Sequence, residues 1–512
     1  MKAKPLMIQG VASSVGKSWI VAGLCRIFKQ DGYRVAPFKS QNMALNSFIT
    51  SDGLEMGRAQ VVQAEAAGLL PDVRMNPVLL KPTTDRNSQV IIGGKVYGNM
   101  SAVEYHDYKP QLAGMIQEVY NSLAAENEIV VIEGAGSPAE INLRDKDIVN
   151  MGMAELADAP VLLVGDIDRG GVFASLAGTM LWLTESERRR VQGTIINKFR
   201  GDAAILEPGL RMLEERIQVP TLGVVPYLPL NIEDEDSLTE RFGRRGNVAA
   251  RVEIAVMKLP RISNFTDFNV FENIADVNIR YAETASQLEK ADLIILPGTK
   301  NTIGDLEYLR TNGLESAIIR KHRQGVEIFG ICGGYQMLGK TIADPYRVES
   351  SREKTAGMGL LNVSTVMERE KTTIQSRGEV CEDAGLLEGL KGTRLAGYQI
   401  HMGVTAPQDG TVPFIRFSGH PGEGRERVFD GGVCNIQGNV FGTYLHGLFD
   451  NLQFTLGLIN NIRRRKGFEP IQGGSGDYQA FKESQYDLLA DHLRQNLDLK
   501  GIYRMMENWK SR

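Results

Sequence analysis

The chain has 512 residues, of which 42% are hydrophobic and 23% charged, and its formal net charge is -4. These values are typical of a soluble globular protein, and the length exceeds what one hydrophobic core supports, so we expect at least two domains. The small negative charge gives no reason to expect nucleic acid or a membrane as partner. No apolar run approaches the ~20 residues that a membrane span requires.

The four cysteines are scattered along the chain without C-x-x-C spacing. This pattern argues against a disulfide framework and against a structural zinc site. Met1 leads into a short apolar strand and not into a signal peptide. We therefore expect a cytoplasmic protein, and the sequence is compatible with a homo-oligomer.

A phosphate-binding loop is predicted near the start of the chain. A short apolar strand is followed by G-V-A-S-S-V-G-K-S, from Gly10 through Gly16 to Ser18, and then by the amphipathic helix Trp19–Gln30. The loop has one residue more between its glycines than the commonest form. Its backbone N–H groups would hold the phosphates of ATP, Lys17 would reach the terminal phosphates, and Ser18 would ligate Mg²⁺.

An acidic residue at the end of a second buried strand provides a further predicted magnesium contact. The apolar run Ile129–Ile132 ends in Glu133, followed by glycines. A carboxylate at that place would be costly without a cation, and phosphate-loop enzymes use such a residue for Mg²⁺. Glu55, in the G-L-E-M-G-R segment, is a further candidate ligand.

Polar residues follow other predicted strands of the same sheet. Lys39, Gln41 and Asn42 follow one strand, and Asn197 and Lys198 follow another. Alternating strands and helices predict a doubly wound, mostly parallel α/β sheet, in which ligands bind at the carboxyl ends of the strands. We expect the first group to bind a polyanionic, amide-forming substrate and the second to contact the nucleotide base. A merely polar surface loop is the alternative for the first group.

Cys332 lies where a buried strand becomes a helix, with Gly333 and Gly334 permitting the turn. A thiol near a helix N-terminus is favoured as thiolate, and this is the arrangement of a nucleophile. The backbone N–H groups of Gly333 and Gly298, the latter in the loop after an earlier strand, could form an oxyanion hole. A small buried cysteine with no chemical role is the alternative.

A cysteine nucleophile requires a base, and the chain has six histidines. His446 is our choice, because it ends the predicted strand N-V-F-G-T-Y-L-H and precedes a glycine. His401, in an alternating strand, and His420, in a glycine-rich loop, are expected to be non-catalytic.

We expect the chain to have four parts. We expect a phosphate-loop α/β domain over 1–230, a charged and glycine-bearing linker over 231–250, a second α/β domain over 251–450 and a helical tail over 451–512.

The motifs of the second half resemble those of class I glutamine amidotransferases. They are P-G-T-K-N-T at 297–302, G-I-C-G-G-Y-Q-M-L-G at 330–339 and G-T-Y-L-H-G at 442–447. The phosphate loop, with its additional residue, resembles that of dethiobiotin synthetases. Together the two halves resemble the cobyric acid synthase family. Ordinary triad amidotransferases carry a glutamate two residues after the histidine, where this chain has Leu448, so what orients His446 stays open.

The resemblance implies a ligase that uses glutamine, ATP and Mg²⁺ on a corrinoid. The implied substrate is adenosylcobyrinic acid a,c-diamide, amidated at its b, d, e and g propionates, with Lys39 at the reacting carboxylate. Cobyrinic acid a,c-diamide synthase, which is similar, is the nearest alternative. A phosphate-loop partition or scaffold ATPase is an alternative of another class, although an amidotransferase domain would have no use there.

Overall fold

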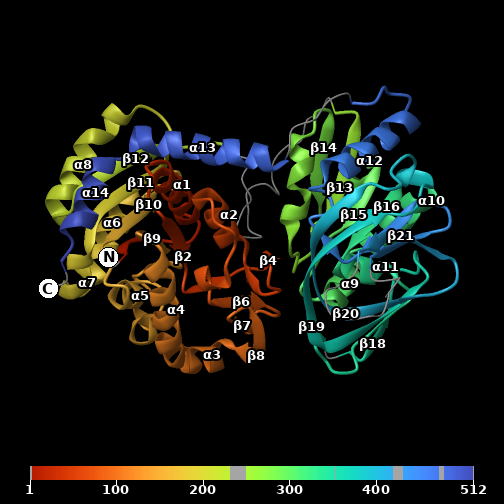
Figure 1. The fold of residues 1–512 in the computed structure, drawn as a ribbon, viewed down its shortest axis with the longest axis horizontal. Coiled ribbons are helices and arrows are strands. Elements are labelled where there is room, and N and C mark those ends of the chain that lie inside the picture. The colour runs from red at the N-terminus through yellow and green to blue at the C-terminus, as the bar shows by residue number, and fades with distance from the viewer. Residues whose placement is uncertain (1–2, 231–249, 351, 419–430, 472–477, 511–512) are drawn as a thin grey trace.

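The structure is a computed structural model that describes residues 3–230, 250–350, 352–418, 431–471 and 478–510. It consists of two α/β bodies that lie side by side (Figure 1). Apart from residue 250, the expected linker over 231–250 lies outside the described residues, and so does His420.

The first body is built on a six-stranded sheet in the order β12-β11-β10-β1-β9-β2. All its pairings are parallel, so the predicted doubly wound parallel sheet is confirmed. Its strands are β1 (Lys4–Gly10), β2 (Val35–Phe38), β9 (Ile129–Glu133), β10 (Val161–Asp166), β11 (Val191–Phe199) and β12 (Thr221–Pro226). The chain reverses its direction of winding between β1 and β9, so the phosphate loop and Glu133 are neighbours at one edge.

Helices cover both faces of this sheet. Along β1, Leu6 and Ile8 face one apolar cluster and Met7 faces the other, as expected for a strand buried on both sides. The helices are α1 (Lys17–Gln30), α2 (Arg58–Ala67), α3 (Ala102–Tyr108), α4 (Ala113–Glu126), α5 (Met151–Leu156), α6 (Val172–Trp182), α7 (Glu185–Arg190) and α8 (Ala203–Ile217), with the 3-10 turns η1 (Val73–Met75), η2 (Lys109–Leu112) and η3 (Ile141–Lys146).

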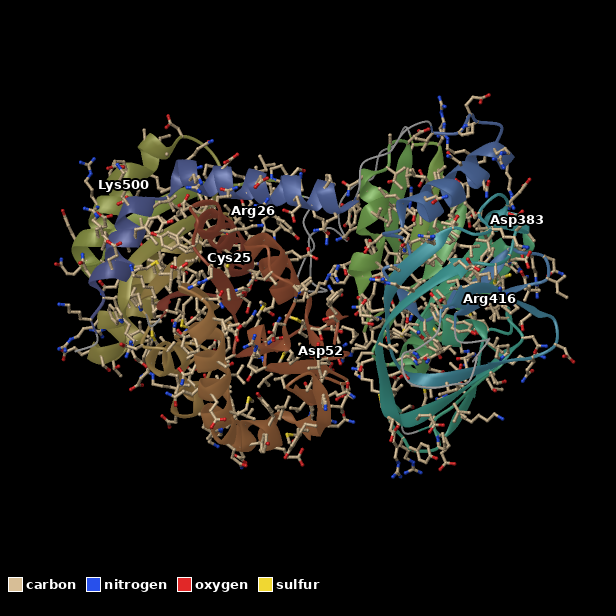
Figure 2. All side chains as sticks on the ribbon, in the orientation of Figure 1. Cys25, Arg26, Asp52, Asp383, Arg416 and Lys500 are labelled. Atoms are coloured by element: carbon tan, nitrogen blue, oxygen red, sulfur yellow. The ribbon has the colours of Figure 1, made fainter. Side chains whose placement is uncertain are left out.

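Two small sheets lie beside the main one, on the side that faces the second body (Figure 1). The order of the first is β3-β6-β7-β8, and the second is the hairpin β4-β5. Their strands are β3 (Gln41–Met43), β4 (Ser47–Ile49), β5 (Glu55–Gly57), β6 (Val78–Pro82), β7 (Asn87–Ile92) and β8 (Lys95–Ser101). Asp52, in the β4–β5 turn, marks the edge that approaches the second body (Figure 2).

The second body contains a mixed twelve-stranded sheet. Five parallel strands, β14-β13-β15-β16-β23, are continued by the antiparallel β22, β21 and β19, and β20 pairs with β19 and β24. The strands are β13 (Val252–Met257), β14 (Val277–Ala282), β15 (Leu293–Leu296), β16 (Glu327–Ile331), β17 (Thr341–Ala343), β18 (Lys354–Ala356), β19 (Val363–Val380), β20 (Arg394–Pro407), β21 (Thr411–Phe417), β22 (Gly432–Asn435), β23 (Val440–Thr443) and β24 (Leu445–His446). The helices are α9 (Thr302–Thr311), α10 (Leu314–Arg323) and α11 (Gly333–Leu338), with the 3-10 segments η5 (Phe265–Asn273), η6 (Ala285–Leu288) and η7 (Gly385–Leu387).

The C-terminal helices contact both bodies. α12 (Leu452–Arg465) contributes Phe454 and Leu458 to the core of the second body. α13 (Tyr478–Asn496) and α14 (Leu499–Asn508) return to the first body, where Tyr486 and Leu493 join an apolar cluster with residues of α1. Arg26 of α1 pairs with Asp487 of α13 at 2.7 Å (Figure 2). Among the helices of the described segments, none is both long and apolar enough to cross a bilayer.

Candidate functional site

Cys332 occupies a sharp turn between β16 and α11. Its φ is 51°, a left-handed value that costs energy for a residue with a side chain, and such strain is common at nucleophiles. Its N–H donates to the Thr443 carbonyl at 2.8 Å, which fixes the turn against the neighbouring strand. A Cβ on Gly334 would lie 2.0 Å from the Leu296 carbonyl oxygen. Only glycine fits there, and the turn holds the thiol at the carboxyl edge of the sheet.

His446 lies beside this thiol and has an acidic partner. Its Nδ1 is 2.6 Å from Oδ2 of Asp267, and the Gly447 N–H donates to Oδ1 of the same carboxylate at 3.0 Å. Burial alone would lower the pKa of His446, but the charge and hydrogen bond of Asp267, with a hydrogen bond to the Cys332 thiol, raise it to about 10. The three side chains form a cysteine, histidine and aspartate triad.

Asp267 is the functional residue that sequence reasoning missed. It is carried by η5, and it takes the orienting role of the glutamate that is absent at position 448, where Leu448 is buried in the core. Asp267 does not lie at the end of a predicted strand, and its partner His446 is 179 positions away in the chain. Only the tertiary structure brings them together.

The two glycines predicted to form the oxyanion hole flank the triad. Gly333 is the first residue of α11, directly after Cys332. A Cβ on Gly298 would lie 3.2 Å from Cε1 of His446, so this glycine approaches the imidazole closely. The carbonyl of Gly298 accepts from the Ser263 N–H at 2.8 Å, which fixes the orientation of the loop.

His401 lies near the triad but is held differently. Its Nδ1 is 2.7 Å from the Gly403 carbonyl, so that nitrogen carries the proton, and its ring stacks on Tyr444 with centroids 3.7 Å apart. Burial, together with the charge of the nearby His446, outweighs this hydrogen bond and lowers the pKa of His401 to about 4. His401 is therefore neutral near pH 7.

The phosphate loop lies between β1 and α1. Gly16 adopts φ 94°, and a Cβ there would lie 2.2 Å from the amide nitrogen of Asn197. Lys17 Nζ donates to the carbonyls of Ala12 and Gly136 at 3.0 and 3.1 Å, so its ammonium lies over the loop. Both strand-end residues expected at the nucleotide base contact the loop itself: Asn197 donates to the Val15 carbonyl at 2.8 Å, and Lys198 donates to that of Ser14 at 2.9 Å.

Glu133 is the centre of the polar cluster beside this loop. Its Oε1 accepts from the Ser18 hydroxyl at 2.8 Å and from Lys39 Nζ at 2.9 Å, while Oε2 accepts from Gln63 at 2.5 Å. No group of three or more acidic, histidine or cysteine side chains forms a metal cage in the described part of the chain. The Ser18 hydroxyl and the Glu133 carboxylate fit a Mg²⁺ that takes its other ligands from phosphates and water.

Two further predicted substrate residues lie next to this cluster. Asn42 donates to Oε1 of Gln60 at 2.9 Å, and Gln60 in turn lies 3.5 Å from Glu133. Gln41 accepts from the Tyr105 hydroxyl at 2.6 Å.

The predicted metal ligand Glu55 is placed elsewhere. Its Oε1 lies 2.9 Å from Lys81 Nζ and its Oε2 lies 2.5 Å from Lys371 Nζ, a residue of the second body. Burial would raise the pKa of Glu55, but the two ammonium groups outweigh it and hold the pKa at about 2. Both oxygens are thus neutralised by lysines, and the magnesium role that the sequence suggested for Glu55 does not fit its contacts.

Comparisons with known proteins agree with this pair of sites. Residues 6–238 match the CobQ/CobB/MinD/ParA nucleotide binding domain, and residues 253–454 match the CobB/CobQ-like glutamine amidotransferase domain. The cobyric acid synthase of Thermoanaerobacter sp. (strain X514) is 55% identical over 99% of this chain and 100% of its own length. The chain belongs to the cobyric acid synthase family. The cobyric acid synthases of Streptococcus sanguinis (strain SK36) and Yersinia enterocolitica are 56% and 54% identical, each over 98% of this chain and over 99% and 98% of their own lengths.

Membership of the cobyric acid synthase family confirms the predicted enzyme class. The protein is a glutamine-hydrolysing ligase that uses ATP, with one domain for each half of the reaction. A partition or scaffold ATPase is not supported, because the second half of the chain is an amidotransferase.

Proposed function

We propose that this enzyme amidates the b, d, e and g propionate carboxylates of adenosylcobyrinic acid a,c-diamide to give cobyric acid, in cobalamin biosynthesis. One observation carries the proposal: a glutaminase triad and a phosphate-loop site with a buried lysine and carboxylate occur together in a chain that matches cobyric acid synthases along its whole length. The magnesium site, the residue roles and the domain limits given above are parts of the same proposal.

The glutamine half of the reaction belongs to the triad. The Cys332 thiolate attacks the side-chain carbonyl carbon of glutamine, and the N–H groups of Gly298 and Gly333 stabilise the negative oxygen that develops. His446, held protonated by Asp267, gives its proton to the departing nitrogen, so ammonia leaves and a thioester remains. Water then hydrolyses the thioester and releases glutamate.

The ATP half belongs to the phosphate loop. A propionate oxygen attacks the terminal phosphorus of ATP, ADP leaves, and ammonia then displaces phosphate from the acyl phosphate to form the amide. Lys17 and Lys39 are cations that would offset the charge of the reacting groups, while Mg²⁺ on Ser18 and Glu133 would neutralise phosphate oxygens. Lys39 forms a buried ion pair with Glu133, with Nζ and Oε1 2.9 Å apart.

A time course by mass spectrometry tests the substrate. The enzyme is incubated with the a,c-diamide, ATP, Mg²⁺ and glutamine, and we expect a ladder of products in which each step replaces one OH by NH₂. Partly amidated products should be released between steps, because one ATP site serves several similar carboxylates. If the a,c-diamide is inert and unamidated cobyrinic acid is converted instead, the enzyme is an a,c-diamide synthase and the proposal is wrong.

A further inference from the structure

A short segment of the first body, Asn46 and Ser47, contacts the second body close to the triad. The Asn46 side-chain oxygen accepts from the backbone N–H of Phe265 at 3.2 Å. Ser47 and Asn264 bond reciprocally, since the Ser47 N–H donates to the Asn264 side chain at 3.4 Å and that side chain donates to the Ser47 carbonyl at 3.3 Å. The first body therefore holds two successive residues of the second.

These two residues begin the segment that carries the acid of the triad. Phe265 is the first residue of η5, and Asp267 lies two residues further on. The Asp267 N–H donates to the Asn264 carbonyl at 3.1 Å, and Asn264 has φ 52°, a left-handed value that asparagine adopts more readily than most residues. The side chain of Asn264 is held by hydrogen bonds with Ser47 of the other domain.

A tyrosine provides a second connection. The Tyr398 hydroxyl donates to the Ser47 carbonyl at 3.0 Å and accepts from the Asn264 side chain at 2.9 Å. Its ring stacks on the imidazole of His446, with centroids 5.4 Å apart and planes inclined by 21°. The same residues of the first body thus contact both the segment that carries Asp267 and the ring that packs on His446.

The whole connection is closed to solvent. Asn46, Ser47, Asn264 and Tyr398 are between 1% and 3% exposed. Buried polar groups without hydrogen-bond partners are costly, so this set of hydrogen bonds favours one docked arrangement of the two bodies.

We propose that Asn46 is a positioning residue for glutamine hydrolysis, supplied by the ATP-binding domain to the amidotransferase domain. By accepting from the N–H of Phe265, it fixes the start of η5 and so keeps the Asp267 carboxylate within hydrogen-bond distance of His446. Asn46 follows Gln41 and Asn42 in the same segment of the first body. The segment that borders the proposed corrinoid site therefore also contacts the part of the second body that carries Asp267. This inference rests on the proposed function only in taking glutamine as the nitrogen donor.

The test is Asn46→Ala in the full-length enzyme, assayed for glutamine hydrolysis without corrinoid. We expect kcat to fall about tenfold or more, because small misplacements of catalytic groups cost up to ~10²-fold, while KM for glutamine changes little. The pH profile of kcat should shift as well, since a loosened Asp267 supports a lower pKa of His446. Synthesis supported by ammonium salts should persist, which a folding defect would not allow.

Thr373→Val is the matched control. The Thr373 hydroxyl donates across the same interface, to the Gly53 carbonyl at 2.8 Å, and the substitution removes one interdomain hydrogen bond at nearly constant volume. Its kcat and pH profile should remain those of the wild type. If Thr373→Val lowers kcat as much as Asn46→Ala, or if Asn46→Ala leaves kcat and the pH profile unchanged, the positioning role is overturned.

A second variant decides the matter if Asn46→Ala loses ammonium-supported synthesis too. Asn46→Asp keeps a side-chain oxygen that can accept from the Phe265 N–H. A kcat above that of Asn46→Ala supports the inference, and a kcat as low as that of Asn46→Ala, with wild-type thermal unfolding, overturns it. Absence of glutaminase activity in the wild type would instead contradict the proposed function, so the two failures are distinguishable.

Discussion

His446 and Asp267 are 179 positions apart in the chain, yet their side chains meet at 2.6 Å in the buried interior of the second body. The aspartate occupies Nδ1, so the other ring nitrogen is the one available to the Cys332 thiol. The carboxylate also accepts from the N–H of Gly447, which fixes it relative to the strand that carries the histidine.

Asp267→Asn should therefore reduce kcat for glutamine hydrolysis by about 10² to 10⁴-fold, since an amide in this role favours the wrong tautomer. The pKa of His446, about 10 in the intact pair, should fall toward its ordinary value of 6.5, because the neutral amide no longer stabilises the imidazolium. At pH 8 the imidazole would then be mostly neutral. A pH profile of kcat checks the shift, and a wild-type profile would remove Asp267 from the triad.

Cys332→Ala should abolish glutamine-dependent synthesis while ammonium salts still support it, because only the source of ammonia is lost. His446→Ala should behave alike. His401→Ala is the comparison, since His401 is a neutral residue hydrogen-bonded to a carbonyl, and it should retain most glutaminase activity. Release of glutamate measures all three. A Cys332→Ala enzyme that still used glutamine would show that the thiol is structural.

Lys17→Ala and Glu133→Gln should block synthesis from either nitrogen source, because carboxylate activation precedes the entry of ammonia. Both residues belong to the polar cluster at the phosphate loop, where Glu133 contacts Ser18 and Lys39. Formation of ADP in the presence of ammonia and the a,c-diamide is the measurement. The glutaminase activity of the same variants, assayed separately, shows that the second body is intact, and normal ADP formation would exclude the altered residue from the mechanism.

Glu55→Gln should destabilise the protein by about 1–3 kcal/mol, because it removes the counter-charge of Lys81 and Lys371 and weakens their hydrogen bonds. Burial already lowers the pKa of Lys371 to about 7, so this lysine becomes neutral in the variant at pH 7. The pKa of Glu55 is about 2 in the folded protein and 4.5 ordinarily, so its contribution is present above about pH 4.5 and is lost as the pH falls toward 2. Urea unfolding of both proteins at pH 7 and near pH 2.5 measures this difference.

Glu185→Gln provides the control for that experiment. Glu185 pairs with Arg189 on the exposed face of α7, where ion pairs contribute little. The free energy of unfolding of the Glu185→Gln protein should equal that of the wild type at both pH values. Equal stability of the Glu55→Gln protein at pH 7 would mean that the lysines find other partners in the interface.

The sequence predicted most of the site residues that lie at the carboxyl ends of parallel strands. Lys39 and Glu133 each lie at the end of an apolar run, and Lys17 lies in the loop-to-helix segment that follows another. The carboxyl ends of parallel strands meet at one edge of a sheet, so the pattern predicted that these residues would be close together. The elbow at Cys332 was predicted for a similar reason, since a strand, a glycine pair and a helix leave few other conformations.

The missed features depend on contacts that no local pattern records. Asp267 lies in a 3-10 segment without strand periodicity, and its role follows only from the position of His446. Glu55 was named as a candidate metal ligand from its segment alone, but its partner Lys371 comes from the other body, 316 positions further along. The negative charge of a glutamate in a sequence does not show whether its partner will be a metal ion or the ammonium group of a lysine.

The return of α13 and α14 to the first body has a consequence for how the protein is made. Tyr486 and Leu493 complete an apolar cluster on the α1 face of that body, but more than 200 residues of the second body are synthesised first. Translation proceeds at ~5–20 residues per second, so α13 is synthesised on the order of tens of seconds after the first body, and the α1 face stays uncovered during that time. The ribosome therefore delivers the glutamine-hydrolysing half before the ATP-binding half can finish folding, and a chain interrupted before Tyr478 would expose that apolar face to chaperones and proteases.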